Sequence, residues 1–431
     1  MNKMLTPIAA LVAASLLTAC GSQAVKQNDT SNVTASTVVN QYADIAEATY
    51  GDSYLTAVAL QDTIDAFLNA PTEANLQLAK DAWIAARVPY QQTEVYRFGN
   101  AIVDEWEGNV NAWPLDEGLI DYVSADHYGS ESDLNPLYTA NVIANESLMI
   151  GGQTIDASTI TPELISEHLQ EADGVEANVA SGYHAIEFLL WGQDLNGTNP
   201  GAGNRPATDF DLDNCTHGHC DRRREYLAAV TALLVDDLKY MADAWKTNGD
   251  ARIALLEQSP EQGLSTILTG MGSLAYGELG GERTKLGLML HDPEEEHDCF
   301  SDNTHWSHYY DAKGIKNVYL GEYQRVDGSW VKGPSLSALV AEQNSALDKE
   351  MKSDLIMTEA AGQAMVDAAA QGQTFDVLIA MNNTEGNALV QDFVDSLVDQ
   401  TRTTEDIIRL LDLQDIALEG SDSLDNPSSV F

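Results

Sequence analysis

The sharpest chemical pattern in the chain is a histidine and a glutamate three positions apart, His184 and Glu187. The residues around them, from Gly182 to Gly192, are apolar almost throughout, which predicts a buried helix. Residues three apart on a helix share a face, so the imidazole and the carboxylate are expected side by side. Helical metal proteins use such pairs as ligands, and a buried glutamate needs a partner or a metal ion. The alternative is a His–Glu hydrogen bond inside a protein core.

A second group of polar donors lies between Glu294 and His305. Three consecutive glutamates are followed there by His297, Asp298 and Asp302. Carboxylates and imidazoles suit iron, zinc or manganese better than copper(I). A solvated acidic loop is the alternative interpretation of this stretch.

Of the four cysteines, Cys20 lies near the N-terminus, Cys215 and Cys220 form a close pair, and Cys299 stands alone. Cys215 and Cys220 lie in the sequence Cys-Thr-His-Gly-His-Cys, close enough to close a small disulfide loop in an oxidising compartment. With the two intervening histidines, the pair could instead hold zinc or copper. Cys299 is left without an assigned role.

The N-terminus predicts export and a lipid anchor. A basic start is followed by an uncharged apolar run of about 14 residues, which is shorter than the roughly 20 needed to span a bilayer. The run ends in Leu-Thr-Ala before Cys20, which resembles the bacterial lipobox, so we expect a signal peptide at 1–19 and lipid on Cys20. An ordinary signal peptide with a chance cysteine is the alternative. Gly21 follows where a retention signal would have aspartate, which favours the outer membrane, facing the periplasm. Residues 20–37 are predicted to be a flexible tether.

The composition is that of an acidic globular protein. The chain has 431 residues, 44% of them hydrophobic, and a formal net charge of −45. A field of this sign repels phosphates, so no nucleic-acid partner is expected. It attracts cations, although a solvated acidic surface explains the same composition.

The elements that must position these residues are predicted to be helices. Apolar residues recur at steps of three and four over 222–246, and strand-like alternation is scarce outside 317–331. Two long polar loops are expected at about 193–220 and 291–316. The sequence therefore predicts an all-α protein of two packed helical bundles, about 38–220 and 221–415, with a tail at 416–431.

Several separated segments together resemble the imelysin family, and in particular its iron-regulated branch. The segments, in chain order, are Trp83–Tyr90 running on to Gly99, Asn111–Asp116, Gly182–Gly192, Gly277–Arg283 and Glu294–His305. The resemblance covers about 38–413, nearly the whole chain after the tether.

The resemblance implies a helical fold of two bundle-like halves with a metal site between them. It implies that His184 and Glu187 belong to this site, with Glu94 as a third ligand and Asp116 as a further one. The later half would add candidates of its own, namely Glu278, Arg283, His297 and His305. Iron is the expected metal because of the iron-regulated branch, and the ligand types admit zinc equally.

The predicted function is metal binding in iron uptake, with membrane iron-uptake proteins as partners and the lipid as the membrane attachment. A metallopeptidase is the first alternative, but the His-Glu-x-x-His pattern and the Gly-x-Ser-x-Gly pattern are both absent. A scaffold for a membrane transport partner, with a purely structural His–Glu pair, is the second.

Overall fold

A computed structural model describes residues 33–413 and 416–430. Of these residues, 63% are helical and 4% lie in strands, which confirms the predicted all-α class. The predicted signal peptide, Cys20 and most of the tether lie outside the described residues. Among the helices that are described, none is both long enough and apolar enough to cross a membrane.

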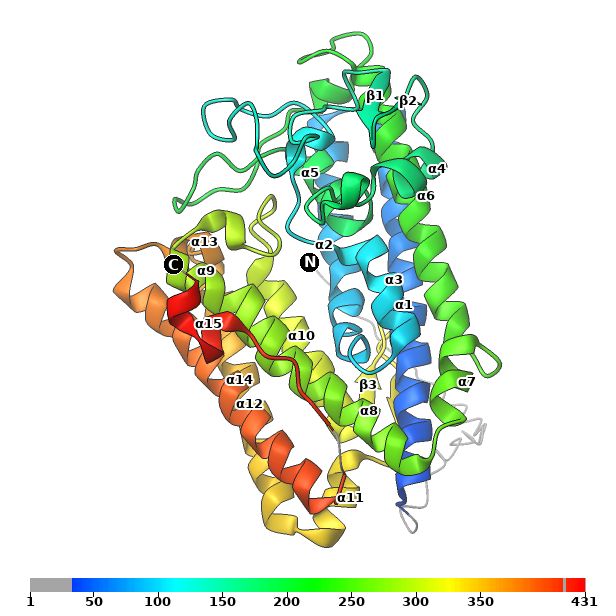
Figure 1. Cartoon of the computed structure of the whole chain (residues 1–431), viewed down its shortest axis with the longest axis vertical. Helices are drawn as coiled ribbons and strands as arrows, with labels where there is room; N and C mark the ends of the chain where they lie inside the picture. Colours follow the sequence, from blue (N-terminus) through cyan, green and yellow to red (C-terminus); the bar gives the residue numbers. More distant parts are fainter. Residues whose placement is uncertain (1–32, 414–415, 431) are drawn as a thin grey trace, which may run out of the picture. The chain divides into compact units, whose positions relative to one another are not determined.

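The first group of helices packs around the long helix α1 (Figure 1). Its members are α1 (Ala35–Asn69), α2 (Glu73–Gln91), α3 (Ala101–Asn111), α5 (Gly182–Trp191) and α6 (Cys220–Ala244). The side chains of Thr34 and Thr72 accept backbone N–H bonds and so begin α1 and α2. The predicted apolar face of α6 is buried, from Leu227 to Met241.

The second group of helices packs around α14, and the chain enters it from α6 through residues 245–259. It contains α8 (Pro260–Ser273), a π-helical stretch (Leu274–Lys285), α9 (Leu286–Leu290), α10 (Thr304–Leu320), α11 (Leu336–Gln343), α12 (Ser345–Ala369), α13 (Phe375–Ile379) and α14 (Thr384–Leu410). Helix α14 packs against α12 and the π-helical stretch, and α12 packs against α10. Helix α6, expected in the later half, packs instead against α1 and α5 in the first group.

The two groups of helices meet where α10 crosses α2 and α8 crosses α1. The crossing is close at Gly314, because a Cβ atom there would lie 2.8 Å from the backbone oxygen of Gln92. A glycine therefore allows α10 to lie directly on the end of α2. This contact aligns the segments that carry the candidate site.

Short elements occupy the connections. The remaining helices are α4 (Pro162–Leu164), α7 (Asp250–Leu256) and α15 (Asp422–Asp425), and two hairpins are formed by β1 (Ser147–Ile150) with β2 (Gln153–Asp156) and by β3 (Glu322–Gln324) with β4 (Trp330–Lys332). The second hairpin lies within the region expected to contain strands. The residues beyond 415 pack on the second group, where Ser423 Oγ donates to the Gly281 carbonyl at 3.0 Å.

One of the two predicted loops is irregular over nearly its whole length, and the other is irregular only over its first part. Residues 193–219 are irregular apart from a short 3-10 turn at Ala207–Phe210. The expected loop at 291–316 is irregular only up to Asn303, because α10 begins at Thr304. Polar residues such as Ser307, His308 and Asp311 form the buried face in the first half of α10, and apolar residues from Ala312 to Tyr319 are buried only in its second half.

Cys215 and Cys220 form a disulfide, with their Cα atoms 5.8 Å apart. The bond closes the loop that precedes α6 and removes both sulfurs as metal ligands. Cys299 is a free thiol in the segment between α9 and α10.

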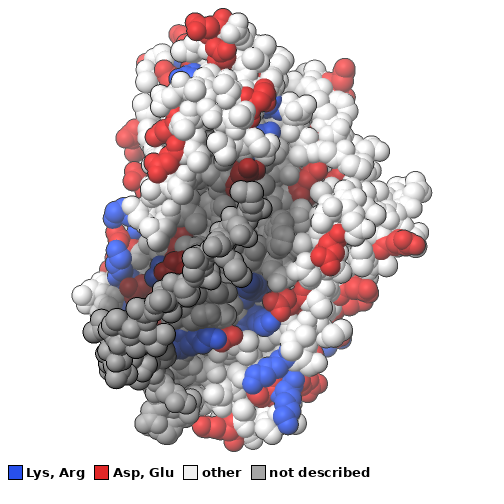
Figure 2. Space-filling view, turned by 180° about the vertical axis from the view of Figure 1, so that it is seen from behind, with Lys and Arg blue, Asp and Glu red and all other residues white. Residues whose placement is uncertain are grey.

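The acidic composition is visible on the surface. Acidic side chains are spread over the face shown in Figure 2 rather than gathered in one patch. The surface charge therefore does not by itself mark a binding site. Carboxylates that are buried are more informative.

We expect Gly314→Ala to destabilise the protein by about 1–3 kcal/mol, because the methyl group would push α10 away from α2. The measurement is urea unfolding followed by circular dichroism. Gly51→Ala inside α1 is the matched control, because the nearest atom to its Cβ is Arg325 Nη2 at 3.8 Å. The control should gain about 0.5–1 kcal/mol from helix propensity. Equal stability of the two variants would contradict this account of the junction.

Candidate metal centre

Helix α5 places His184 and Glu187 in the interior of the protein. All ten of its residues are buried. It begins at Gly182, whose φ of +79° and contact with the Val110 carbonyl leave no room for a side chain. On the side of α2, Trp83 Nε1 donates to the Tyr183 carbonyl at 3.0 Å. These contacts fix the start of α5 against both α2 and α3.

The two predicted residues share a face of α5 and contact one another. His184 Nδ1 lies 3.0 Å from Glu187 Oε2. The other carboxylate oxygen of Glu187 accepts two hydrogen bonds from Ser301, from the backbone N–H at 2.9 Å and from the hydroxyl at 2.6 Å. His184 Nε2 is buried and has no hydrogen-bond partner. A carboxylate that holds one imidazole nitrogen while the other stays free is the usual arrangement at metal-binding histidines.

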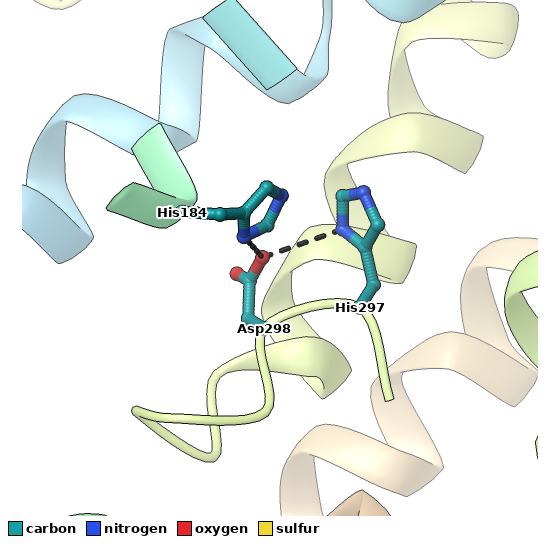
Figure 3. Close-up of side chains that lie close together, drawn as sticks. All are labelled: His184, His297 and Asp298. Carbon is teal, nitrogen blue, oxygen red and sulfur yellow. Dashed lines mark ion pairs between the residues drawn. The ribbon is translucent and has the colours of Figure 1, made fainter. Parts of the chain in front are cut away.

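The segment before α10 brings His297 and Asp298 to the same place (Figure 3). Asp298 Oδ1 lies 3.3 Å from His297 Nδ1 and 4.0 Å from His184 Nδ1. One donor atom from each of the three residues lies within 4.8 Å of the other two. The three side chains are at most 1% exposed. Two imidazoles and one carboxylate therefore converge from positions more than 100 residues apart in the sequence.

An arginine from α2 completes this cluster. Arg87 Nη2 donates to Asp298 Oδ1 at 2.7 Å and lies 3.4 Å from His297 Nδ1, while its Nη1 donates to Asn111 at 2.6 Å. The guanidinium also lies over the ring of Tyr183, 5.0 Å from its centre. Arg87 thus supplies a positive charge to a buried carboxylate.

Burial and this charge set the protonation of the cluster. Burial, with the nearby Arg87, lowers the pKa of His184 to about 3, so its ring is neutral. Burial also raises the pKa of Glu187 well above its usual range, helped by the charge of Asp298. Although burial opposes ionisation of Asp298 too, Arg87 and His297 hold its pKa well below its usual range. Neutral imidazoles beside an ionised carboxylate are ready to bind a cation, and Glu187 can release a proton when one arrives.

Glu94 and Glu278 lie in a separate cluster around Arg283. Arg283 contacts Glu94 at 2.6 Å, Glu278 at 2.8 Å and Asp311 at 3.2 Å, through three different nitrogens. The arginine lies on the π-helical stretch, Glu94 follows α2, and Asp311 lies on α10. Glu94 is therefore engaged with Arg283 and is not brought to His184.

The other two predicted residues also lie apart from His184. Asp116 is half-buried and accepts a hydrogen bond from Asn135 at 2.5 Å. His305 lies in the first turn of α10, with its Nδ1 buried and unpaired. Neither residue belongs to the group formed by His184, His297 and Asp298.

Sequence reasoning did not single out Arg87, although a signal was present. Arg87 follows Trp83 by four positions and precedes Tyr90 by three, so it lies on the predicted apolar face of α2. An arginine on a buried face needs an anionic partner. The sequence did not indicate which of the later carboxylates this partner would be.

The chain belongs to the Imelysin family, whose pattern matches residues 46–404. Over 109 residues it is 35% identical to iron-regulated protein A of Synechococcus elongatus, an overlap that covers 25% of this chain and 28% of that protein. A solved structure described as an iron-regulated protein A precursor from Parabacteroides distasonis is similar with a TM-score of 0.62 at 19% identity, covering 88% of this chain and 95% of that one. An imelysin-like protein from Psychrobacter arcticum gives a TM-score of 0.55 at 16% identity, covering 89% and 98%. The two structures establish a shared fold.

Arg283→Met should destabilise the protein by about 3–5 kcal/mol, because it leaves Glu94 and Asp311 buried without their counter-charge. Urea unfolding at pH 7 measures the effect. Arg402→Met is the control, since the side chains of Arg402 and its partner Asp399 are 71% and 66% exposed. Adding Glu94→Gln to Arg283→Met should restore part of the loss. A loss below about 1 kcal/mol for Arg283→Met would contradict a compensating role.

The buried ring of His308 should make stability depend on pH. Burial, with the charge of Arg283, lowers the pKa of His308 to about 3, whereas the unfolded chain protonates near 6.5. Folded protein therefore binds fewer protons, and stability is lost as pH falls from 6.5 towards 3.

Metal-free His308→Gln should accordingly lose about 2 kcal/mol less than the unsubstituted protein between pH 7 and pH 5. Urea unfolding at the two pH values measures this difference. The exposed His168 provides the control variant His168→Gln, which should retain the original slope. An unchanged slope in His308→Gln would refute the explanation.

Proposed function

We propose that this protein binds iron through His184, His297 and Asp298, with Glu187 orienting His184, and takes part in iron uptake. The observation that carries the proposal is the convergence of these donors in one buried place, with His184 Nε2 unpaired. Compared with the ligands expected from the sequence, His297 and Asp298 take the place of Glu94 and Asp116.

The spacing of the donors suits a metal ion. Ligand bonds of about 2.0–2.2 Å place neighbouring donor atoms about 3.0–3.5 Å apart. Asp298 Oδ1 lies 3.3 Å from His297 Nδ1, which matches this spacing. Its distance to His184 is 4.0 Å measured to Nδ1, the nitrogen that Glu187 holds, so the neighbouring side chains must rotate for the free Nε2 of His184 to share an ion with Asp298. Two histidines and one carboxylate are also the donor set of many iron(II) sites. The similarity to iron-regulated protein A supports iron as the cargo, and zinc is the alternative ion.

Arg87 competes with the ion for the same carboxylate. An ion bound to Asp298 Oδ1 takes over the charge compensation that Arg87 Nη2 gives from 2.7 Å. The guanidinium must then move towards Asn111, its other partner. Because Arg87 and Asn111 are both buried, the guanidinium stays in the interior and the ion adds its charge to the site. Release of the Glu187 proton offsets part of this charge, and the competition with Arg87 favours reversible binding over permanent capture.

We further propose that lipid on Cys20 anchors the protein in the outer membrane, facing the periplasm. The short apolar run and the residues before Cys20 support this placement. A cargo-binding protein held there would exchange iron with membrane-bound uptake proteins as partners.

The metallopeptidase alternative is less well supported. A peptidase must bring a peptide bond to the metal and its water molecule. His184 and His297 are each 1% exposed and Asp298 is fully buried, so this arrangement suits a single ion better than a polypeptide.

Metal binding by the protein purified from bacterial envelopes in detergent tests the proposal. Anaerobic titration with iron(II) should give one buried site per chain, and His184→Ala or His297→Ala should weaken it by at least tenfold. His168→Ala replaces an exposed imidazole and should bind as the original protein does. The proposal fails if the double variant His184→Ala/His297→Ala binds unchanged, or if no binding tighter than millimolar is found.

The identity of the ion needs a separate measurement, because zinc binds most nitrogen and oxygen sites more tightly than iron(II) in solution. Metal analysis of the protein isolated from its own envelope should find iron. If the protein contains zinc instead, the proposed metal site stands, but iron is not its cargo.

A further inference from the structure

A second group of carboxylates, separate from the histidine cluster, meets at the junction of the two helix groups. Asp194 follows α5, Asp302 precedes α10, and Asp376 lies at the start of α13. One oxygen from each lies within 4.8 Å of the other two. The segments are also joined directly, because the Gly203 N–H donates to the Phe300 carbonyl at 2.9 Å.

The buried members of this group lack the partners that buried carboxylates need. Asp376 is fully buried, and neither of its carboxylate oxygens accepts a well-formed hydrogen bond, although the Thr374 hydroxyl and the Val377 N–H lie near it. Asp302 is 7% exposed, and its Oδ1 is also unpaired. Asp298, by contrast, has Arg87 and two further hydrogen-bond donors. A buried carboxylate without such compensation is unfavourable unless it is protonated or binds a cation.

A fourth carboxylate, itself buried, lies near enough to Asp376 and Asp302 to be affected by their charges. Glu296 is 1% exposed and its Oε1 is unpaired. Burial raises its pKa well above the usual range, and the charges of Asp376 and Asp302 raise it further. The pKa of Asp302 is raised to about 8 and that of Asp376 to about 6, in both cases chiefly by burial. Without a cation, this group therefore keeps protons that carboxylates ordinarily release below neutral pH.

We propose that Asp194, Asp302 and Asp376 bind a calcium ion. All the donor atoms are carboxylate oxygens. Softer metals prefer nitrogen or sulfur ligands, so this donor set favours a hard cation. Calcium takes six to eight oxygen ligands in a flexible arrangement, whereas magnesium requires nearly ideal octahedral geometry and usually keeps several of its waters. The half-exposed Asp194 leaves room for water to complete the six to eight ligands that calcium takes.

The calcium site is distinct from the proposed iron site. It would affect iron binding only by stabilising the part of the fold that holds the iron ligands. The ion would tie the segment after α5 to α13, and it would hold the segment that carries His297 and Asp298. Calcium would then be a structural ion at the junction, distinct from the cargo.

Thermal unfolding of the chelator-stripped protein with added calcium chloride tests this inference. We expect millimolar calcium to raise the unfolding temperature, and Asp302→Asn or Asp376→Asn to abolish that rise. Each substitution removes repulsion, so the calcium-free variants should be at least as stable as the calcium-free original. Asp194→Asn is half-exposed, so it should leave the fold intact and weaken calcium binding by at least tenfold in equilibrium dialysis.

Controls separate this site from the acidic surface and from the iron site. Asp126→Asn removes an exposed carboxylate and should keep the full calcium effect, including in 0.15 M salt, where surface binding is screened. The double variant His184→Ala/His297→Ala should keep it too, so loss of iron binding and loss of calcium binding are distinguishable. The inference is overturned if the original protein shows no calcium effect, if the aspartate variants retain it, or if magnesium at equal concentration acts as strongly.

Discussion

The buried ion pair between Arg87 and Asp298 is the interaction on which the candidate site depends. It joins α2 in the first helix group to the segment that precedes α10 in the second, at 2.7 Å. An ion pair in the interior adds little net stability, because both groups lose water, but breaking it leaves a charge stranded. Its main effect is therefore on arrangement. His297 lies next to Asp298 in the chain, so the pair also fixes His297 against His184.

A second arginine forms a similar buried ion pair elsewhere at the junction of the two helix groups. Arg283 comes from the second helix group and compensates Glu94, which belongs to the first. Arg87 thus reaches from the first helix group to the second, and Arg283 reaches from the second to the first. An apolar junction of the same area would hold the groups together as well. It would not place unpaired histidine nitrogens and carboxylates between them, so the polar junction is better explained by ligand binding than by stability.

The sequence predicts the parts of this arrangement that depend on local pattern. The helical class, the buried face of α6 and the pairing of His184 with Glu187 all follow from spacing, because residues three and four apart meet on a helix. Partners that meet only in three dimensions could not be predicted in the same way. Glu94 was assigned to His184 by resemblance, yet it pairs with Arg283, 189 positions later. The start of α10 does not stand out in the sequence because the buried face of its first half is polar, which removes the apolar signal on which the prediction relies.

The two candidate sites share two stretches of chain, and this makes them interdependent. His184 and Asp194 belong to α5 and the segment that follows it, and Asp298 and Asp302 are four residues apart before α10. An ion at the oxygen site would restrain both stretches, so the histidine site would lose less conformational freedom on binding its own ion. Linkage requires the reverse effect to be equally large, so an ion at the histidine site would strengthen binding at the oxygen site. Repulsion between the two cations opposes the effect, and Glu187 and Glu296, whose pKa values are raised by burial, can offset it by releasing their protons. Uptake of metal by this protein is therefore expected to release protons and to become more favourable as pH rises.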